Sequence, residues 1–159
     1  MKLIAQPLTA EGFAPFGTVL DAPQQAGRTY FDGTLTNRRG GARPSLSVAR
    51  RDEIATLPFT ATMMERHEFS SQSFVPIDCS GWIVMVAPHA ADSRPDMTKA
   101  LAFLAGPEQG VTYGANVWHH PLTIVEQPAA FAIFMWLEGG KGDEEFFTLA
   151  EPVTIGSRT

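Results

Sequence analysis

Two short stretches of this sequence place together side chains that could do acid-base chemistry or hold a metal ion. The first is Glu65-Arg66-His67, followed five residues after His67 by Gln72. Residues two apart on a β-strand point to the same face, so Glu65 and His67 share a face and Arg66 points to the other. After a tight turn, Gln72 can fold back beside them on the neighbouring strand. A carboxylate, an imidazole and an amide would then converge.

The second stretch is Asn116-Val117-Trp118-His119-His120-Pro121, which precedes another apolar segment. Consecutive residues of a strand face opposite sides, so His119 and His120 cannot both line one pocket unless the backbone bulges. One of the two is therefore expected to have a structural role. The remaining histidine, His89, lies in a polar loop, where we expect it to be exposed.

Both stretches also have a purely structural interpretation. Glu65 and His67 could be a surface-facing pair on a half-buried strand. Of His119 and His120, one imidazole could be held by a carbonyl group and the other could lie at a subunit contact. The sequence contains no His-Glu-x-x-His, no Gly-x-Ser-x-Gly and no phosphate-binding loop. The glycine-rich residues 138–142 lack the spacing of such a loop and are expected to form a hairpin turn.

Length and composition indicate one folded domain made of short elements. The chain has 159 residues, close to the typical size of one domain, and we expect a single domain over residues 1–159. Hydrophobic residues make up 44% and charged residues 18%, which excludes a largely disordered chain. The 14 glycines and 12 prolines leave few stretches in which a long helix could form.

Charge and cysteine content exclude several classes of partner. The net charge of −5 at pH 7 has the wrong sign for binding nucleic-acid phosphates. The single cysteine, Cys79, cannot form an intrachain disulfide, and no apolar stretch is long enough to span a membrane. We therefore expect a cytoplasmic protein that binds neither nucleic acid nor membrane. Residues 28–51 carry six arginines against one acid, Asp32, and could form a solvated loop or steer a small anion towards a pocket.

Alternating apolar residues and turn signals predict a mainly β structure. After a strand at residues 3–8 we expect a helical turn with Thr9 as its N-cap and a strand at residues 18–20. Residues 45–48 alternate as a half-buried strand would. Further strands are expected at residues 59–67, 73–77, 81–87, 111–113, 122–125, 130–137 and 146–149, while residues 99–105 fit either a helix or a strand. This pattern indicates an all-β, jelly-roll antiparallel β-barrel with one or two short helical turns, whose mouth is a natural ligand pocket.

The order of these stretches resembles the ureidoglycolate lyase family of allantoin degradation. The resemblance covers about residues 3–150 and rests on Phe13-Ala14-Pro15-Phe16-Gly17, Glu65-Arg66-His67, Gln72-Ser73-Phe74-Val75-Pro76, Pro95-Asp96, Glu108-Gln109-Gly110-Val111-Thr112-Tyr113 and Trp118-His119-His120-Pro121-Leu122. It implies a cupin-like barrel, a homodimer, and the cleavage of (S)-ureidoglycolate to glyoxylate and urea.

The resemblance also implies a set of metal ligands. Cupins carry His-x-His followed by a glutamate in one motif and a histidine in a second motif. Laid on this chain, Glu65 and His67 take the place of the paired histidines, Gln72 that of the glutamate, and His119 that of the last histidine. This set would accept a divalent metal, nickel by association with the family, without demanding one.

Two departures from the family pattern concern the loop before Trp118. Asn116 stands where many relatives have glycine, and asparagine tolerates a positive φ. The basic residue that relatives often carry near Gly114 and Ala115 is missing here. We therefore expect the substrate carboxylate to be bound by residues 28–51 or by backbone amides.

Cleavage of ureidoglycolate needs a general base for its hydroxyl group and a proton for the departing urea nitrogen. We expect His67 or His119 to take the hydroxyl proton, and Glu65 to orient that imidazole or to return the proton to nitrogen. Gln72 would bind the ureido group, and the other candidate substrate contacts are Asn116, Trp118, His120 and Arg66. The alternatives are a hydrolase that releases ammonia and carbon dioxide, and a non-catalytic cupin-like sensor of a small anionic metabolite.

Overall fold

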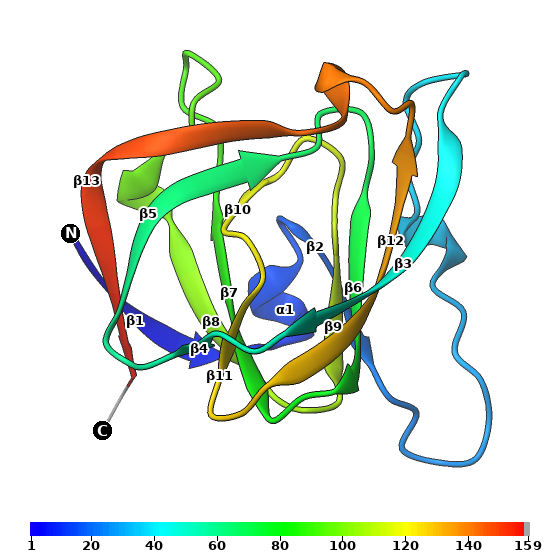
Figure 1. Cartoon of the computed structure of the whole chain (residues 1–159), viewed down its shortest axis with the longest axis horizontal. Coiled ribbons are helices and arrows are strands. Elements are labelled where there is room, and N and C mark those ends of the chain that lie inside the picture. Colours follow the sequence, from blue (N-terminus) through cyan, green and yellow to red (C-terminus); the bar gives the residue numbers. More distant parts are fainter. Residues whose placement is uncertain (158–159) are drawn as a thin grey trace.

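The computed structural model describes residues 1–157 and consists mainly of β-strands (Figure 1). In chain order the elements are β1 (Lys2–Pro7), α1 (Ala10–Phe13), β2 (Gly17–Asp21), η1 (Asp32–Thr34), β3 (Arg43–Arg51), β4 (Ile54–Ala55), β5 (Phe59–Arg66), β6 (Gln72–Asp78), β7 (Gly81–Ala87), η2 (Met97–Lys99), β8 (Leu101–Ala105), β9 (Gln109–Tyr113), β10 (Trp118–His119), β11 (Thr123–Val125), β12 (Ala129–Leu137), η3 (Lys141–Asp143) and β13 (Glu145–Ser157). Here α denotes an α-helix and η a 3-10 turn. No helix within the described range is long and apolar enough to cross a membrane.

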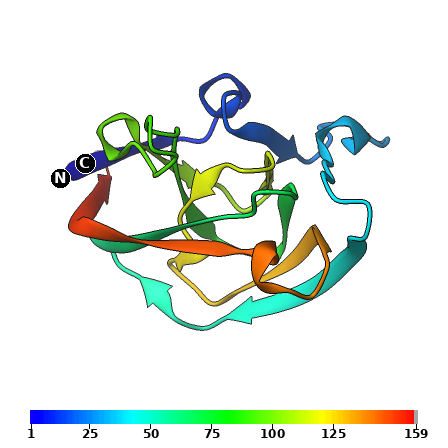
Figure 2. The same ribbon diagram turned by 90° about the horizontal axis from the view of Figure 1, so that it is seen from above.

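The strands form two sheets that surround a common interior (Figure 2). One sheet has the order β10-β5-β13-β1-β8-β7-β11-β4, and because β10 also pairs with β7, the strands from β10 to β7 close into a ring. The other sheet has the order β2-β9-β6-β12-β3. Most pairings are antiparallel, but β1 pairs in parallel with β13 and β8, and β4 with β11. The prediction of an all-β, cupin-like barrel is confirmed.

Strand β7 is buried along its whole length and organises the interior. Because successive side chains point to opposite faces, Trp82 and Val84 pack into one hydrophobic cluster, and Ile83 and Met85 pack into another. The same strand pairs with β10, where Val86 lies opposite His119. The fully buried strand β7 therefore fixes the position of β10, which carries His119, one of the candidate catalytic histidines.

All ten expected strands are present, most with small shifts at their ends, but β3 and β13 are much longer than the expected 45–48 and 146–149. Thr9 caps α1 as expected, since its hydroxyl oxygen accepts a hydrogen bond of 3.1 Å from the Gly12 N–H. Of the ambiguous residues 99–105, Leu101–Ala105 form strand β8 and Lys99 is the last residue of η2. His89 is exposed, as the polar loop around it indicated.

Two expectations about local structure are wrong. Residues 138–142 do not form a hairpin turn, because β12 and β13 belong to different sheets and the connection contains η3. The second concerns the strand expected at residues 45–48, which is present within β3 but is not half-buried on its apolar side. Leu46 and Val48 of that strand are 72% and 69% exposed, so its apolar side chains point outward. Alternation in the sequence shows that two faces differ but not which face is covered.

Candidate active site

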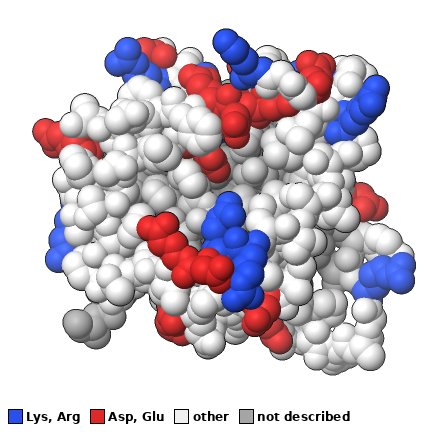
Figure 3. Space-filling view, viewed as in Figure 1, with Lys and Arg blue, Asp and Glu red and all other residues white. Residues whose placement is uncertain are grey.

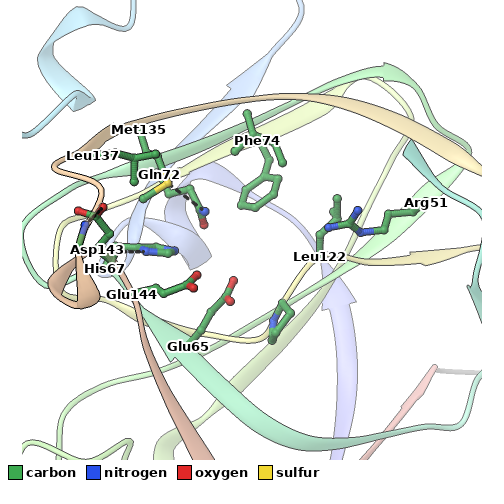
Figure 4. Close-up of a pocket in the computed structure, with 13 residues that line it drawn as sticks. Arg51, Glu65, His67, Gln72, Phe74, Leu122, Met135, Leu137, Asp143 and Glu144 are labelled. Carbon is green, nitrogen blue, oxygen red and sulfur yellow. Dashed lines mark hydrogen bonds between the residues drawn. The ribbon is translucent and has the colours of Figure 1, made fainter. Parts of the chain in front are cut away.

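A pocket of about 440 Å³ is lined by three of the predicted site residues, Glu65, His67 and Gln72 (Figure 4). Its volume lies in the range of small-molecule sites. It is lined by residues from β3, β5, β6 and β12 and from the segments that follow β5, β10 and β12: Arg51, Glu65, His67, Gln72, Phe74, Pro121, Leu122, Ile133, Met135, Leu137, Gly140, Asp143 and Glu144. One wall is apolar, and the polar side chains other than Arg51 gather near His67.

Glu65 and His67 form a buried cluster with His119, which lies behind them and does not itself line the pocket. Their ligand atoms all lie within 4.8 Å of one another. Strand pairing produces part of the arrangement, because His119 of β10 lies directly opposite Glu65 of β5. Gln72 completes the group from β6, which belongs to the other sheet and is not hydrogen-bonded to β5. Gln72 thus folds back towards Glu65 and His67 as expected, but on the opposite sheet.

The imidazole of His119 is held on both sides and faces two oxygen atoms. Its Nδ1 is 2.9 Å from the carbonyl oxygen of Val117, to which it donates a hydrogen bond. Its Nε2 is 3.2 Å from Oε1 of Glu65 and 3.1 Å from Oε1 of Gln72. Tyr113 stacks on the ring with centroids 4.0 Å apart. Three lone-pair atoms therefore converge, and either a proton on Nε2 or a bound cation would satisfy them.

His67 differs from His119 because one of its ring nitrogens is free. Its Nδ1 lies 2.8 Å from the backbone carbonyl oxygen of Asp143, which fixes the proton on that nitrogen. Its Nε2 is buried and has no hydrogen-bond partner among the described residues. Burial and the neighbouring His119 lower the pKa of His67, so the ring is held neutral. An unprotonated, unpartnered nitrogen in a pocket can act as a base or as a metal ligand.

Glu65 is held as a carboxylate. Burial by itself would raise the pKa of Glu65, but the hydrogen bond and the positive charge of His119 outweigh it and lower this pKa. The pocket therefore has a charged hydrogen-bond acceptor at Glu65 and a ring nitrogen without a hydrogen-bond partner at His67.

Asp143 positions His67 through its backbone. The Asp143 carboxylate accepts hydrogen bonds from the N–H groups of Glu138, Gly139 and Gly140 at 3.0, 2.7 and 3.2 Å, and it pairs with Arg39 at 2.6 Å. Burial by itself would raise the pKa of Asp143, but these N–H groups and the guanidinium hold it at about 2. These contacts fix the conformation of the turn, so that the backbone carbonyl oxygen of Asp143 accepts the hydrogen bond from Nδ1 of His67.

Four further residues expected to contact the substrate do not line this pocket: Asn116, Trp118, His120 and Arg66. Arg66 lies over the ring of Trp118, with its guanidinium carbon 4.6 Å from the ring centroid, and pairs with Glu145 at 2.6 Å. His120 packs against Phe59 and points its Nδ1 at the carbonyl oxygen of Pro121, 2.9 Å away.

Trp118 and Asn116 instead hold the loops behind the site. The indole of Trp118 is buried and donates to the carbonyl oxygen of Ser93. Asn116 has a φ of 69°, the left-handed conformation that its replacement of glycine suggested, and its backbone N–H donates to the carbonyl oxygen of His67. These residues position the segments that carry His67 and His119.

Three polar residues of the pocket were not singled out from the sequence. Glu144 points towards the same space as Glu65 (Figure 4). Asp143 and Glu144 follow residues 138–142, whose interpretation as a hairpin turn gave no reason to place them at a site. Arg51 is the last residue of the basic segment, and no periodicity distinguishes it from Arg50 beside it.

Comparison with known proteins assigns the chain to a family. Residues 1–156 match the family model described as ureidoglycolate lyase. The chain belongs to the ureidoglycolate lyase family. A ureidoglycolate lyase of Chelativorans sp. is 39% identical, with 97% of this chain and 96% of the relative covered. Ureidoglycolate lyase 1 of Rhizobium meliloti is 38% identical, with 91% and 88% covered, and the enzyme of Brucella anthropi is 37% identical, with 91% and 89% covered. The resemblance read from the sequence is confirmed.

The Asp143 network leads to a prediction about stability and pH. Because its pKa is about 2 in the folded protein and 3.8 ordinarily, the contribution of Asp143 is complete above about pH 4 and is lost as the pH falls towards 2. We expect Asp143→Asn to lower the free energy of unfolding by about 2 kcal/mol at pH 7, and the difference from the unaltered protein to shrink below pH 4. Urea unfolding at pH 7, 4 and 2.5 measures this.

Asp52→Asn is the matched control, because Asp52 pairs with Arg50 on the surface, where both side chains are exposed. Its effect should stay within about 0.5 kcal/mol at each pH. A difference between Asp143→Asn and the unaltered protein that does not change with pH would contradict the assigned role of the carboxylate.

Proposed function

We propose that the protein is a ureidoglycolate lyase that cleaves (S)-ureidoglycolate to glyoxylate and urea by acid-base catalysis. The observation that carries the proposal is the buried, unpartnered Nε2 of His67 beside the Glu65–His119 pair. Membership of the family supports the choice of substrate. The pocket of about 440 Å³ is large enough for this small acid.

The reaction moves two protons and consumes no water. His67 takes the proton of the carbinol hydroxyl on Nε2, the hydroxyl oxygen becomes the aldehyde oxygen of glyoxylate, and the carbon-nitrogen bond breaks. The departing nitrogen receives its proton from the Glu65–His119 pair, in which Glu65 lines the pocket and passes on the proton that it shares with Nε2 of His119, and this completes urea. Gln72 lies beside both histidines and can hydrogen-bond the ureido group.

The nature of the products separates this proposal from its alternatives. A lyase releases urea and glyoxylate in equal amounts, whereas a hydrolase releases ammonia and carbon dioxide in place of urea. A sensor of anionic metabolites would bind ureidoglycolate without turning it over. Quantifying urea, ammonia and glyoxylate from one incubation tests all three, and a yield of ammonia equal to that of glyoxylate would overturn the proposal.

The histidines provide the first prediction for catalysis. We expect His67→Ala and His119→Ala each to lower kcat by about 10²- to 10⁴-fold, the usual contribution of a general base or acid. His120→Ala is the matched control, because His120 is equally buried but packs against Phe59 outside the pocket. Urea release is measured for all three variants, with circular dichroism to verify folding. Full activity in both His67→Ala and His119→Ala would refute the assignment.

A divalent metal also fits this cluster. Two imidazole nitrogens and one carboxylate are a common ligand set for such ions, and the free Nε2 of His67 is available to bind one. Glu65, His67 and His119 would hold the ion, with the Gln72 amide oxygen next to them, and we propose nickel as the ion. When bound, it would supply a Lewis acid for the hydroxyl group of the substrate.

Metal binding is measured directly by titration with Ni²⁺ in a calorimeter. We expect about one ion per chain for the unaltered protein, and binding at least about 10-fold weaker for His119→Ala, since a ligand is lost. His120→Ala should bind as the unaltered protein does. Equal binding by His119→Ala would place the ion elsewhere. Because the same lone pairs would serve a proton or an ion, urea release before and after chelation shows which form is active.

We propose that the protein is a homodimer that buries the outer face of the second sheet. Val48 of β3 and Val75 of β6 flank Ala132 of β12 in register, so the three side chains form one row on that face. Leu46 and Ile77 extend this apolar patch and are 72% and 61% exposed. Contiguous exposed apolar surface is uncommon on monomers, and a second copy of the same chain can cover it by two-fold symmetry.

The dimer is tested by sedimentation equilibrium. We expect twice the chain mass of 17.3 kDa for the unaltered protein and the mass of one chain for Val48→Lys, because a buried unpaired charge opposes association. Leu101→Lys, an exposed apolar position on the other sheet, should leave the dimer intact. A mass of one chain for the unaltered protein would refute the proposal.

A further inference from the structure

The pocket has an uneven distribution of charge. Its acidic side chains are Glu65, Asp143 and Glu144, and Arg51 is the one Lys or Arg that lines it within residues 1–157. Arg51 extends into the pocket from the side opposite His67 and Asp143 (Figure 4). On the face shown in Figure 3, Asp and Glu gather along the upper edge with Lys and Arg beside them, and a smaller group of both signs lies below the centre, with uncharged surface between the two groups.

Strand register explains why Arg51 faces the pocket. In the pairing of β3 with β12, Arg51 lies opposite Ala129 and Ala49 opposite Phe131, and both partners are fully buried. Arg50 lies opposite Ala130, which belongs to the other face of the sheet. The two neighbouring arginines therefore point to opposite sides, as the period of two in a strand requires.

The charge of Arg51 is also not neutralised by the protein. Within residues 1–157 its guanidinium makes one hydrogen bond, from Nη1 to the carbonyl oxygen of Arg50 at 3.3 Å, and no ion pair. Arg39, Arg50 and Arg66 each pair with a carboxylate at 2.6 to 2.8 Å. A guanidinium that lines a pocket without a carboxylate partner is suited to bind a carboxylate from a ligand.

We infer that Arg51 binds the carboxylate of the substrate and thereby sets its orientation. The inference rests on the proposed function, because ureidoglycolate carries its one charge on that group. The carboxylates of Glu65 and Glu144 repel the anionic end, so it turns towards Arg51, and the hydroxyl and ureido groups turn towards His67 and Gln72. No Lys or Arg stands at residues 108–122, which lead up to and include His119, so Arg51 supplies the positive charge from β3.

The test compares Arg51→Gln with Arg50→Gln, its neighbour on the other face. The probe is oxalurate, in which an amide carbonyl replaces the carbinol of ureidoglycolate, so that it keeps the carboxylate and cannot undergo the elimination. We expect Arg51→Gln to weaken oxalurate binding in calorimetry, and to raise KM for ureidoglycolate, by about 10- to 100-fold with a smaller change in kcat. Arg51→Lys should recover part of the loss, and Arg50→Gln should behave as the unaltered protein.

The neutral amide of oxalurate provides a second readout. This amide should bind Arg51→Gln and the unaltered protein equally, because it has no carboxylate that Arg51 could bind. Oxalurate binding by Arg51→Gln that equals that of Arg50→Gln would overturn the inference. Failure of the unaltered protein to release urea would instead overturn the proposed function, and the oxalurate comparison would still decide the role of Arg51.

Discussion

The site depends on one buried contact, in which Nε2 of His119 faces the side-chain oxygens of Glu65 and Gln72. Three groups that accept hydrogen bonds are stable together in a buried site only when a proton or a cation lies among them. A proton on the imidazole satisfies this requirement, and so does a divalent ion. The contact also joins the two sheets, because Gln72 comes from one and the other two residues from the other.

The second constraint is the orientation of His67, which is set from outside the pocket. Arg39 and three backbone N–H groups hold the carboxylate of Asp143, and the carbonyl of the same residue holds the imidazole. The proton of His67 therefore stays on Nδ1, and its Nε2 stays free. His119 faces the carboxylate of Glu65, and His67 is neutral with a free Nε2. Acid-base catalysis needs this difference between a group that supplies a proton and a group that accepts one.

The arginines of residues 28–51 show why a local net charge is a poor guide to function. Arg39 is half-buried and pairs with Asp143 in the turn that supports His67, Arg50 pairs with Asp52 on the surface, and Arg51 reaches the pocket. Their common charge made them look alike in the sequence. Their roles differ because turn geometry places Arg39 and strand register separates the other two.

The sequence by itself determined the fold class, the family and the identity of the central residues. Period two in the strands, and the turn residues between them, are local properties that the sequence carries. The separation of Glu65 and His67 by one residue likewise predicted a shared face. Only the tertiary structure decided which face of β3 is exposed and that residues 138–142 join two sheets. It also decided that Asp143, Glu144 and Arg51 belong to the pocket, because these placements depend on which distant strands pair, and no local pattern encodes such pairing.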